Sequence, residues 1–462
     1  MTEGTTEEST IGPFHKEVLV VTLTILALVT VTAFETMAVS TAMPNVARDL
    51  GFVRTYGFAF SVLMTTQLIG IVLAGVWADR SGPIPGTFAG QVLLGGGSAL
   101  CGFADSSALF LLGRGLTGLG GGLLVVMMYI IAGRVYTDAV RPTLFVYISA
   151  AWILPSLIGP PMSAFLTTHF SWRWVFWIVV LPVIITLASM AYASRHVERL
   201  QLHAGESNRD HAAHVKAAWA GVLIALSAGA VQYGIDDLHL EMSAKTVVGG
   251  IGAVGLLVTA PLLVPRGTWT VRRGLPSVIL SRSLLTGSFF GGVSFLPLFL
   301  HGQRGASLQL AGLAIAVGSL GWAVGAYIQG RDRFAHDRHR LIALGGALLA
   351  VGLASLAVIA AANFKGGLGV LSLILCGLGM GLGVTTTTVL ALELSSVADH
   401  GETSSALQLS DVLGSVLGIA LATALFAAHH VPKQDNPLFG VIFALMAAIA
   451  ALVVVSGQRS ST

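Results

Sequence analysis

The chain has 462 residues, of which 54% are hydrophobic and only 10% are Asp, Glu, Lys or Arg. A soluble domain carries about 25% charged residues, so this composition excludes a soluble protein and predicts one that lies in the lipid bilayer. The longest polar stretch, residues 195–216, has the length of one linker and leaves no room for a catalytic or nucleic-acid-binding domain outside the membrane. The formal net charge of +3 therefore says little by itself, and only the positions of the charged residues along the chain are informative. We expect no nucleic-acid partner.

The few residues that could form covalent links or metal sites are poorly placed to do so. Cys101 and Cys376 both lie inside apolar runs, which indicates packing rather than a disulfide. The histidines of the polar linker lack the spacing of a ligand set, so we expect no metal and no other cofactor. The N-terminus is acidic where a signal peptide would be basic, and we therefore interpret the first apolar run as a retained membrane span.

Apolar runs of about 20 residues, the length that crosses the hydrocarbon core, predict fourteen membrane-spanning helices. They lie at about 18–43, 57–78, 86–103, 108–133, 143–167, 174–194, 217–235, 246–264, 278–300, 310–330, 341–361, 367–392, 404–427 and 437–456. The first six and the last six occupy stretches of nearly equal length. The fold class expected is an all-α polytopic membrane protein with two pseudo-repeated six-helix bundles and an inserted helix pair.

The positions of the basic residues predict the orientation. With the N-terminus inside the cell, seventeen Lys and Arg residues fall on the inner side, seven on the outer side and one in a span, which accounts for all 25. This bias places both termini in the cytoplasm and the protein in the cell membrane. The domain organisation expected is an N-terminal tail 1–17, a bundle 18–194, a cytoplasmic linker 195–216, the inserted pair 217–264, a cytoplasmic loop 265–277, a second bundle 278–456 and a tail 457–462.

Four motifs stand out against this background. Residues 75–82 read GVWADRSG, in which glycines suit a tight turn and an Asp-Arg pair supplies charge. Residues 113–122 place an arginine among closely spaced glycines, which let helix backbones approach each other. Residues 152–164 contain three prolines, which bend a helix by removing backbone hydrogen bonds. Residues 34–44 carry an acid inside the first span and end on a proline.

Together these motifs resemble the major facilitator superfamily, and the whole chain resembles its fourteen-span drug:proton antiporter branch. The resemblance implies a cytoplasmic latch formed by Gly75, Asp79, Arg80 and Gly82, although Pro83 and Pro85 stand where the family has basic residues. It implies bending and close packing at Gly118, Gly122, Pro155, Gly159 and Pro160. The motif at 152–164 is associated with exporters, and here Ser163 and Ala164 replace its closing glycines.

Charged residues inside spans are the best candidates for function, because an ionised group at the bilayer centre costs about 2.5–3.5 kcal/mol. We expect Glu35 to carry the coupling proton, Arg114 at similar depth to modulate it, and Asp411 to be a second candidate. The alternative for each is a group that only braces neighbouring helices. The expected substrate cavity is lined by Phe34, Gln67, Met127, Tyr129 and Trp152.

The function expected is proton-coupled export of hydrophobic or amphipathic small molecules by alternating access, driven by the proton gradient without a cofactor. The partners are the substrate, protons and membrane lipid, and we expect a monomer. A lipid, siderophore or natural-product exporter of the same fold is an alternative, and a transporter-like membrane sensor is a more distant one. A membrane-embedded enzyme acting on lipid would be expected to carry a nucleophile or a metal cluster near the membrane surface, and we find no such set of residues in the sequence.

Overall fold

The computed structural model describes residues 13–15, 18–136, 140–201, 211–235, 244–263, 265, 267–331, 337–362, 368–396, 400–431 and 434–461. Within these ranges it has fourteen α-helices and no strand, so the expected all-α class is confirmed. The helices are α1 (Leu19–Asp49), α2 (Phe58–Ser81), α3 (Pro83–Phe103), α4 (Ser107–Val135), α5 (Arg141–His169), α6 (Arg173–Gln201), α7 (His211–Ile235), α8 (Ala244–Leu263), α9 (Leu275–Val293), α10 (Leu308–Gln329), α11 (Arg338–Ala361), α12 (Gly369–Glu393), α13 (His400–His429) and α14 (Asn436–Gln458). Two short helical turns, η1 (Val53–Thr55) and η2 (Leu298–Gln303), join α1 to α2 and extend α9.

Among the described residues, eleven of these helices are long and apolar enough to cross a membrane. The other three are α3 and the inserted pair α7 and α8. Helix α3 has 21 residues but is rich in glycine, which lowers its hydropathy. The described apolar parts of the inserted pair, Gly221–Val231 and Ala244–Leu256, are shorter than a full span.

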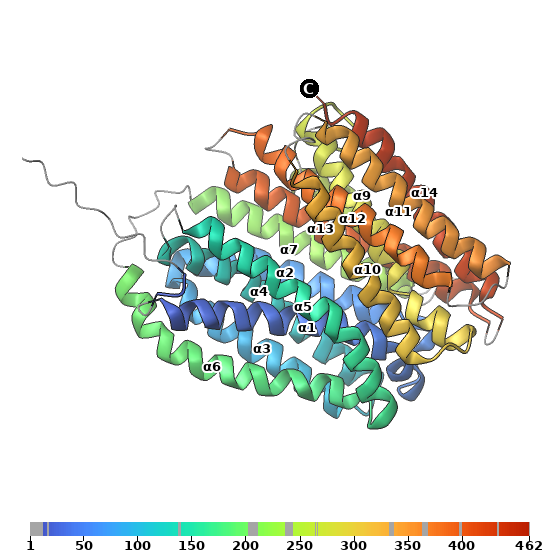
Figure 1. Ribbon diagram of the computed structural model, residues 1–462, viewed down its shortest axis with the longest axis horizontal. Helices are drawn as coiled ribbons and strands as arrows, with labels where there is room; N and C mark the ends of the chain where they lie inside the picture. The colour runs from blue at the N-terminus through green and yellow to red at the C-terminus, as the bar shows by residue number, and fades with distance from the viewer. Residues whose placement is uncertain are drawn as a thin grey trace, which may run out of the picture.

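The two six-helix bundles repeat the same packing. In the first bundle α1 packs against α5 and α6, α4 packs against α2 and α3, and α3 packs against α6. In the second, α9 packs against α13 and α14, α12 packs against α10 and α11, and α11 packs against α14. Each of these contacts of the first bundle thus has a counterpart in the second bundle once the inserted pair is left out. Figure 1 shows the first bundle in blue to green below the second in yellow to red.

Two equivalent helix pairs join the bundles: α5 packs against α10, and α2 packs against α13. We call these two contacts the seams. Helix α10 is the counterpart of α2, and α13 is the counterpart of α5, so exchanging the two bundles turns one seam into the other. The bundles therefore face each other with approximate two-fold symmetry, the arrangement in which a transporter can rock about a central site.

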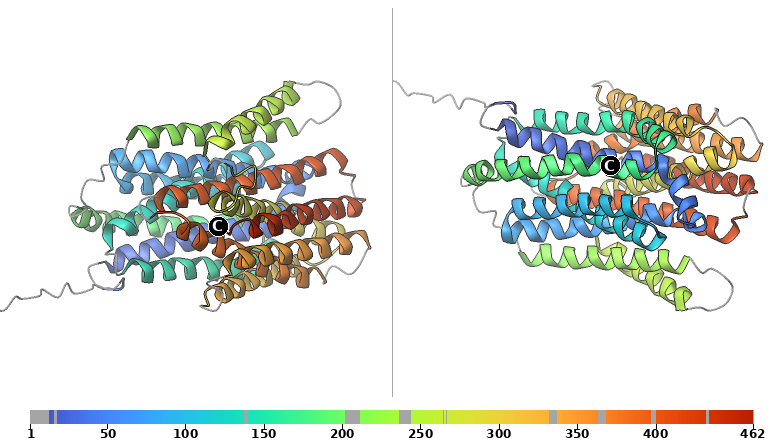
Figure 2. Two further views of the ribbon diagram at one scale, coloured as in Figure 1. Left: turned by 90° about the horizontal axis from the view of Figure 1, so that it is seen from above. Right: turned by 90° about the horizontal axis from the view of Figure 1, so that it is seen from below.

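The inserted pair α7 and α8 lies on the outside of the molecule, as both views in Figure 2 show in light green. Its buried residues Ile224, Ala225 and Ala228 form one apolar cluster with Leu68 of α2 and Val416 of α13. The pair therefore covers the seam between α2 and α13.

Several helix ends differ from the sequence-based ranges, and prolines and glycines explain the differences. Pro44 lies inside α1, which continues to Asp49 instead of ending near 43. Helix α2 continues through Asp79 and Arg80, so Gly82 alone makes the turn, with φ +74°, and Pro83 starts α3 at once. The predicted span 278–300 is interrupted near Pro297, which lacks the N–H needed to continue the helix. Helices α6 and α7 extend into the predicted linker 195–216, of which residues 202–210 are outside the described ranges.

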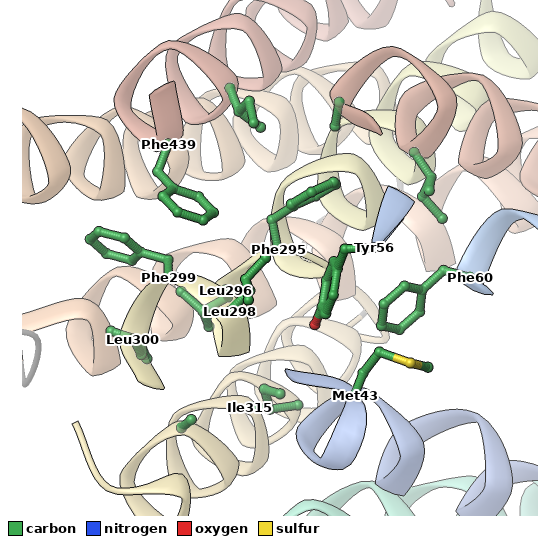
Figure 3. Close-up of a cluster of buried hydrophobic side chains, with 14 of the residues drawn as sticks. Met43, Tyr56, Phe60, Phe295, Leu296, Leu298, Phe299, Leu300, Ile315 and Phe439 are labelled. Atoms are coloured by element: carbon green, nitrogen blue, oxygen red, sulfur yellow. The ribbon is translucent and has the colours of Figure 1, made fainter. Parts of the chain in front are cut away.

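The two bundles are sealed together at the end where α1 leads into α2. Figure 3 shows Met43, Tyr56 and Phe60 of the first bundle packed beside Phe295 and Ile315 of the second. The side chain of Tyr56 is fully buried against Phe60 and Phe295, with ring centroids 5.5 and 5.4 Å away. Among the residues that the structure describes, its hydroxyl has no hydrogen-bond partner. Arg54 reinforces the seal by donating a hydrogen bond of 3.1 Å to the carbonyl of Ala427.

At the opposite end the buried apolar clusters belong to one bundle each. Ala74, Ala78 and Met127 cluster within the first bundle. Val278, Ile279 and Leu407 cluster within the second. The structure is therefore in a conformation closed at the end where α1 leads into α2.

Candidate charge-coupling site between the helices

Glu35 of α1 and Arg114 of α4 form an ion pair inside the first bundle, through Oε1 of Glu35 and Nη1 of Arg114. Both side chains are almost fully buried, with 3% and 1% of their surfaces exposed. Arg114 also donates from Nε to the carbonyl of Ala59 in α2, at 3.4 Å. The pair therefore links three helices of one bundle, and the structure brings together the two residues that the sequence singled out.

Glu35 lies near the middle of α1. It is about 24 Å from Leu19 and about 21 Å from Asp49 along the helix, at 1.5 Å per residue. The carboxylate is 3% exposed, and among the described residues the cation that compensates its charge is Arg114. Replacing one partner of a buried pair leaves an uncompensated charge, which costs about 3–5 kcal/mol.

Glycines of α4 allow this close approach of helices. A Cβ added to Gly118 would be 2.1 Å from the carbonyl oxygen of Leu63 in α2, and one added to Gly122 would be 2.1 Å from that of Gln67. Side chains at these positions would push α4 away from α2 and withdraw Arg114 from its partners. The packing expected of Gly118 and Gly122 thus has a definite geometric basis.

A second charge pair lies in the second bundle, between Asp411 of α13 and Arg282 of α9. Two guanidinium nitrogens of Arg282 contact the two carboxylate oxygens of Asp411. The Nη1 atom of Arg282 also donates to the carbonyl of Val384, at 2.6 Å, and to the hydroxyl of Thr388, at 2.8 Å. These side chains are 12% and 25% exposed, so this pair is more accessible than the first.

Arg282 was missed in the sequence analysis, which counted it among the cytoplasmic cations. The signal was present, because Arg282 lies four residues inside the predicted span 278–300. A buried arginine needs a partner, and Asp411 was the acid at matching depth in that bundle.

The residues of the expected latch are not joined in this conformation. Asp79 and Arg80 are exposed at the end of α2, and among the described residues neither forms an ion pair. Gly82 provides the turn, and Gly75 has open space around its Cα. At the same end of the second bundle Arg338 and Glu393 are paired at 2.8 Å, linking α11 to α12.

The prolines of α5 lie at its contacts with α1 and α10. A Cβ on Gly159 would be 3.5 Å from Phe34 and Ala38 of α1, while a Cβ on Gly312 of α10 would be 2.7 Å from the carbonyl of Pro160. Pro155 is buried, and α5 runs through all three prolines without a break in its assigned range.

The five residues expected to line a cavity differ in their surroundings. Tyr129 is 44% exposed, and Phe34, Gln67 and Trp152 are partly buried. Met127 differs because it is fully buried in one cluster with Ala74, Ala78 and Leu123. Its side chain also packs over Gly86. Met127 therefore fills the contact between helices of the first bundle. The structure thus brings Phe34 beside Gly159 at the α1–α5 contact, and Phe34 and Trp152 pack against the same buried apolar cluster of the first bundle.

The fold and these charge pairs define a membrane transporter of the two-bundle type, and comparison with known proteins identifies the family. The sequence profile of the Major Facilitator Superfamily matches residues 25–418. This chain belongs to the Major Facilitator Superfamily, and the class predicted from the sequence is confirmed.

Among characterised relatives, the multidrug transporter protein MdtP of Bacillus subtilis (strain 168) is 27% identical over 304 residues, covering 65% of this chain and 55% of that protein. Multidrug resistance protein 3 of the same organism is 25% identical, covering 67% of this chain and 60% of its own length. Efflux pump bfoC of Aspergillus brasiliensis is 25% identical, covering 66% and 56%. The matched region thus spans little more than half the length of these relatives.

Solved structures show the same fold at low identity. A peptide transporter POT in complex with sulfate has a TM-score of 0.69 at 16% identity, covering 95% of this chain and 94% of its own. A D-xylose-proton symporter has a TM-score of 0.64 at 15% identity, covering 97% of this chain and all of its own.

Proposed function

We propose that this protein exports hydrophobic or amphipathic small molecules from the cell in exchange for protons, by alternating access. The names of its relatives, which describe multidrug transporters and efflux pumps, support export of such molecules. The aromatic character of the candidates Phe34, Tyr129 and Trp152 supports a substrate of low polarity.

The observation that carries the proton-coupling part is the buried pair of Glu35 and Arg114. A carboxylate that binds a proton loses the charge that attracts the guanidinium. Proton binding and the ion pair therefore compete for the same oxygen atoms. Loading Glu35 with a proton weakens the link between α1 and α4, and releasing the proton restores it, so the packing of the first bundle follows the protonation state.

Alternating access requires that the seal described here opens while the opposite end closes. The seal consists of apolar side chains and few polar links, which separate without stranding a charge. Closure of the other end would bring the unpaired Asp79 and Arg80 of α2 toward α13, with which α2 shares a seam. We assign the end of the molecule that carries Asp79 and Arg80 to the cytoplasm, because Lys and Arg are more frequent there. Both termini then lie in the cytoplasm, and the domain boundaries are those expected from the sequence.

Efflux measured in proteoliposomes tests the proposal. Purified protein is reconstituted with chemically diverse amphipathic fluorescent substrates, and export is followed with an imposed proton gradient, without one, and after an uncoupler is added. The gradient is expected to drive uphill export that the uncoupler abolishes. Export that is unaffected by the gradient would remove proton coupling, and no transport of any substrate by folded protein would favour a transporter-like sensor.

A further inference from the structure

The turn between α8 and α9 and the end of α14 together present a cluster of exposed arginines. Arg272 and Arg273 lie on the turn, and Arg459 follows the last residue of α14. The backbone N–H of Gly274 donates a hydrogen bond of 3.0 Å to the carbonyl of Arg459, which ties the two segments together. We call these three residues the basic turn.

The turn has a defined internal structure. The N–H of Arg272 donates to the carbonyl of Gly267 at 3.0 Å, and the hydroxyl of Thr268, which is 2% exposed, donates to the carbonyl of Pro265 at 2.7 Å. Gly267 has φ +94°, and the side chain of Arg272 packs over it where a Cβ would lie. The hydroxyl of Ser277 in α9 donates to the carbonyl of Arg272 at 2.7 Å. The arginines thus extend from an ordered scaffold.

The charge of the basic turn is not compensated. Within the described residues none of its three arginines forms an ion pair, whereas Arg338 and Arg340 at another loop each pair with an acid. The sequence explains this difference, because residues 242–331 and 437–462 contain no Asp or Glu. Three exposed arginines on two segments that a backbone hydrogen bond joins attract an anion, and the planar guanidinium suits the oxygens of a phosphate.

Apolar side chains beside the basic turn indicate the kind of anion. Trp269 projects from the same turn and is 48% exposed, and tryptophan favours the level of the lipid headgroups. On the last turns of α14, Leu452 and Val455 are 55% and 52% exposed. A ligand that combines a phosphate with acyl chains would satisfy both the arginines and these apolar side chains.

We propose that the basic turn is a binding site for the headgroup of an anionic phospholipid, held by Arg272, Arg273 and Arg459 with Trp269 at the membrane surface. The lipid stabilises the contact of α9 with α14 by joining the turn to the end of α14. This site is separate from the proposed transport mechanism, so it stands or falls independently of proton-coupled export.

The test measures the melting temperature of purified protein in nanodiscs of phosphatidylcholine alone and of phosphatidylcholine mixed with phosphatidylglycerol. We expect phosphatidylglycerol to raise the melting temperature of the wild type, and Arg272→Gln/Arg273→Gln to lose more than half of that rise. Arg134→Gln/Arg331→Gln is the matched control, because both residues are exposed elsewhere, Arg134 in the last turn of α4 and Arg331 just after α10. It should keep the rise.

Two outcomes would overturn the proposal. The first is that phosphatidylglycerol raises the melting temperature of Arg272→Gln/Arg273→Gln as much as that of the wild type, or that the control variant loses as much of this rise. Either result would assign the rise to general surface charge. The second is an equal rise with inorganic phosphate in phosphatidylcholine nanodiscs at matched ionic strength, which would identify a free-anion site. If the double variant does not fold, Arg459→Gln is compared with Arg134→Gln in the same assay, with the same criteria.

Discussion

Arg282 of α9 and Asp411 of α13 are joined at two points, and Arg282 also holds the backbone of α12 through Val384. In the first bundle the pair of Glu35 and Arg114 joins α1 to α4, so the two pairs connect different helices of their bundles. Each bundle therefore contains an acid and an arginine that join its helices. They differ in exposure, because Asp411 is 25% exposed while Glu35 is 3% exposed.

Removing either member of the second pair should destabilise the protein more than removing both. Asp411→Asn leaves Arg282 with a charge that Val384 and Thr388 only partly satisfy, and Arg282→Gln leaves a carboxylate without a cation. Because the pair is partly exposed, we expect a loss of roughly 1–3 kcal/mol, below the 3–5 kcal/mol of a fully buried pair. Thermal melts of both single variants and the double variant measure the coupling. If the stability loss of the double variant equals the sum of the losses of the two single variants, Arg282 and Asp411 do not act as a unit.

Glu35→Gln should abolish proton-driven efflux while substrate binding persists. Glutamine keeps the size of the side chain and its hydrogen-bonding reach but cannot titrate. The measurement is efflux rate against pH in proteoliposomes, with substrate binding followed by fluorescence on the same preparation. Retained uphill export by Glu35→Gln would transfer the role of proton carrier to Asp411.

Arg114→Ala should impair both stability and coupling, because it leaves Glu35 buried without its cation. The expected destabilisation is about 3–5 kcal/mol if the acid stays ionised, and less if the acid takes up a proton. Combining Arg114→Ala with Glu35→Gln removes both charges. The double variant should therefore be more stable than Arg114→Ala, and its export rate should be no lower than that of Glu35→Gln. A double variant whose melting temperature falls below that of both single variants would contradict this pairing.

Asp79→Asn should slow transport without unfolding the protein. Asp79 is exposed and without an ion pair among the described residues, so its neutralisation removes no contact present in this conformation. Its proposed role belongs to the opposite conformation, which should become less populated. We expect normal expression and melting temperature with reduced efflux, and Arg134→Gln serves as an exposed-charge control. A well-folded Asp79→Asn protein with normal efflux would remove the latch.

Single cysteines at Ser207 and Ser307 should react with a membrane-impermeant reagent from opposite sides. Ser307 caps the start of α10 at the sealed end, whereas Ser207 is outside the described residues and lies in the predicted linker. In intact cells only Ser307→Cys should be labelled, with lysed cells as the control. Labelling of both in intact cells would reverse or change the predicted topology.

The sequence allowed prediction of the features that follow from the cost of placing charge or polar backbone in hydrocarbon. Glu35 and Arg114 were singled out because an ionised group in hydrocarbon is costly and the two lie at similar depth. Helix ends were less predictable, since Pro44 is tolerated inside α1 while Pro297 interrupts the next bundle. The burial of Met127 could not be read from periodicity, because most of α4 is apolar and the positions of α2 and α3 decide which of its faces is covered.

The lone hydroxyl of Tyr56 limits how durable the closed conformation can be. An unsatisfied buried polar group costs about 1–3 kcal/mol, and water at an opened gate would recover this energy. Phenylalanine would have filled the same space without that penalty. In the alternating-access cycle proposed above, this penalty would favour opening of the sealed end.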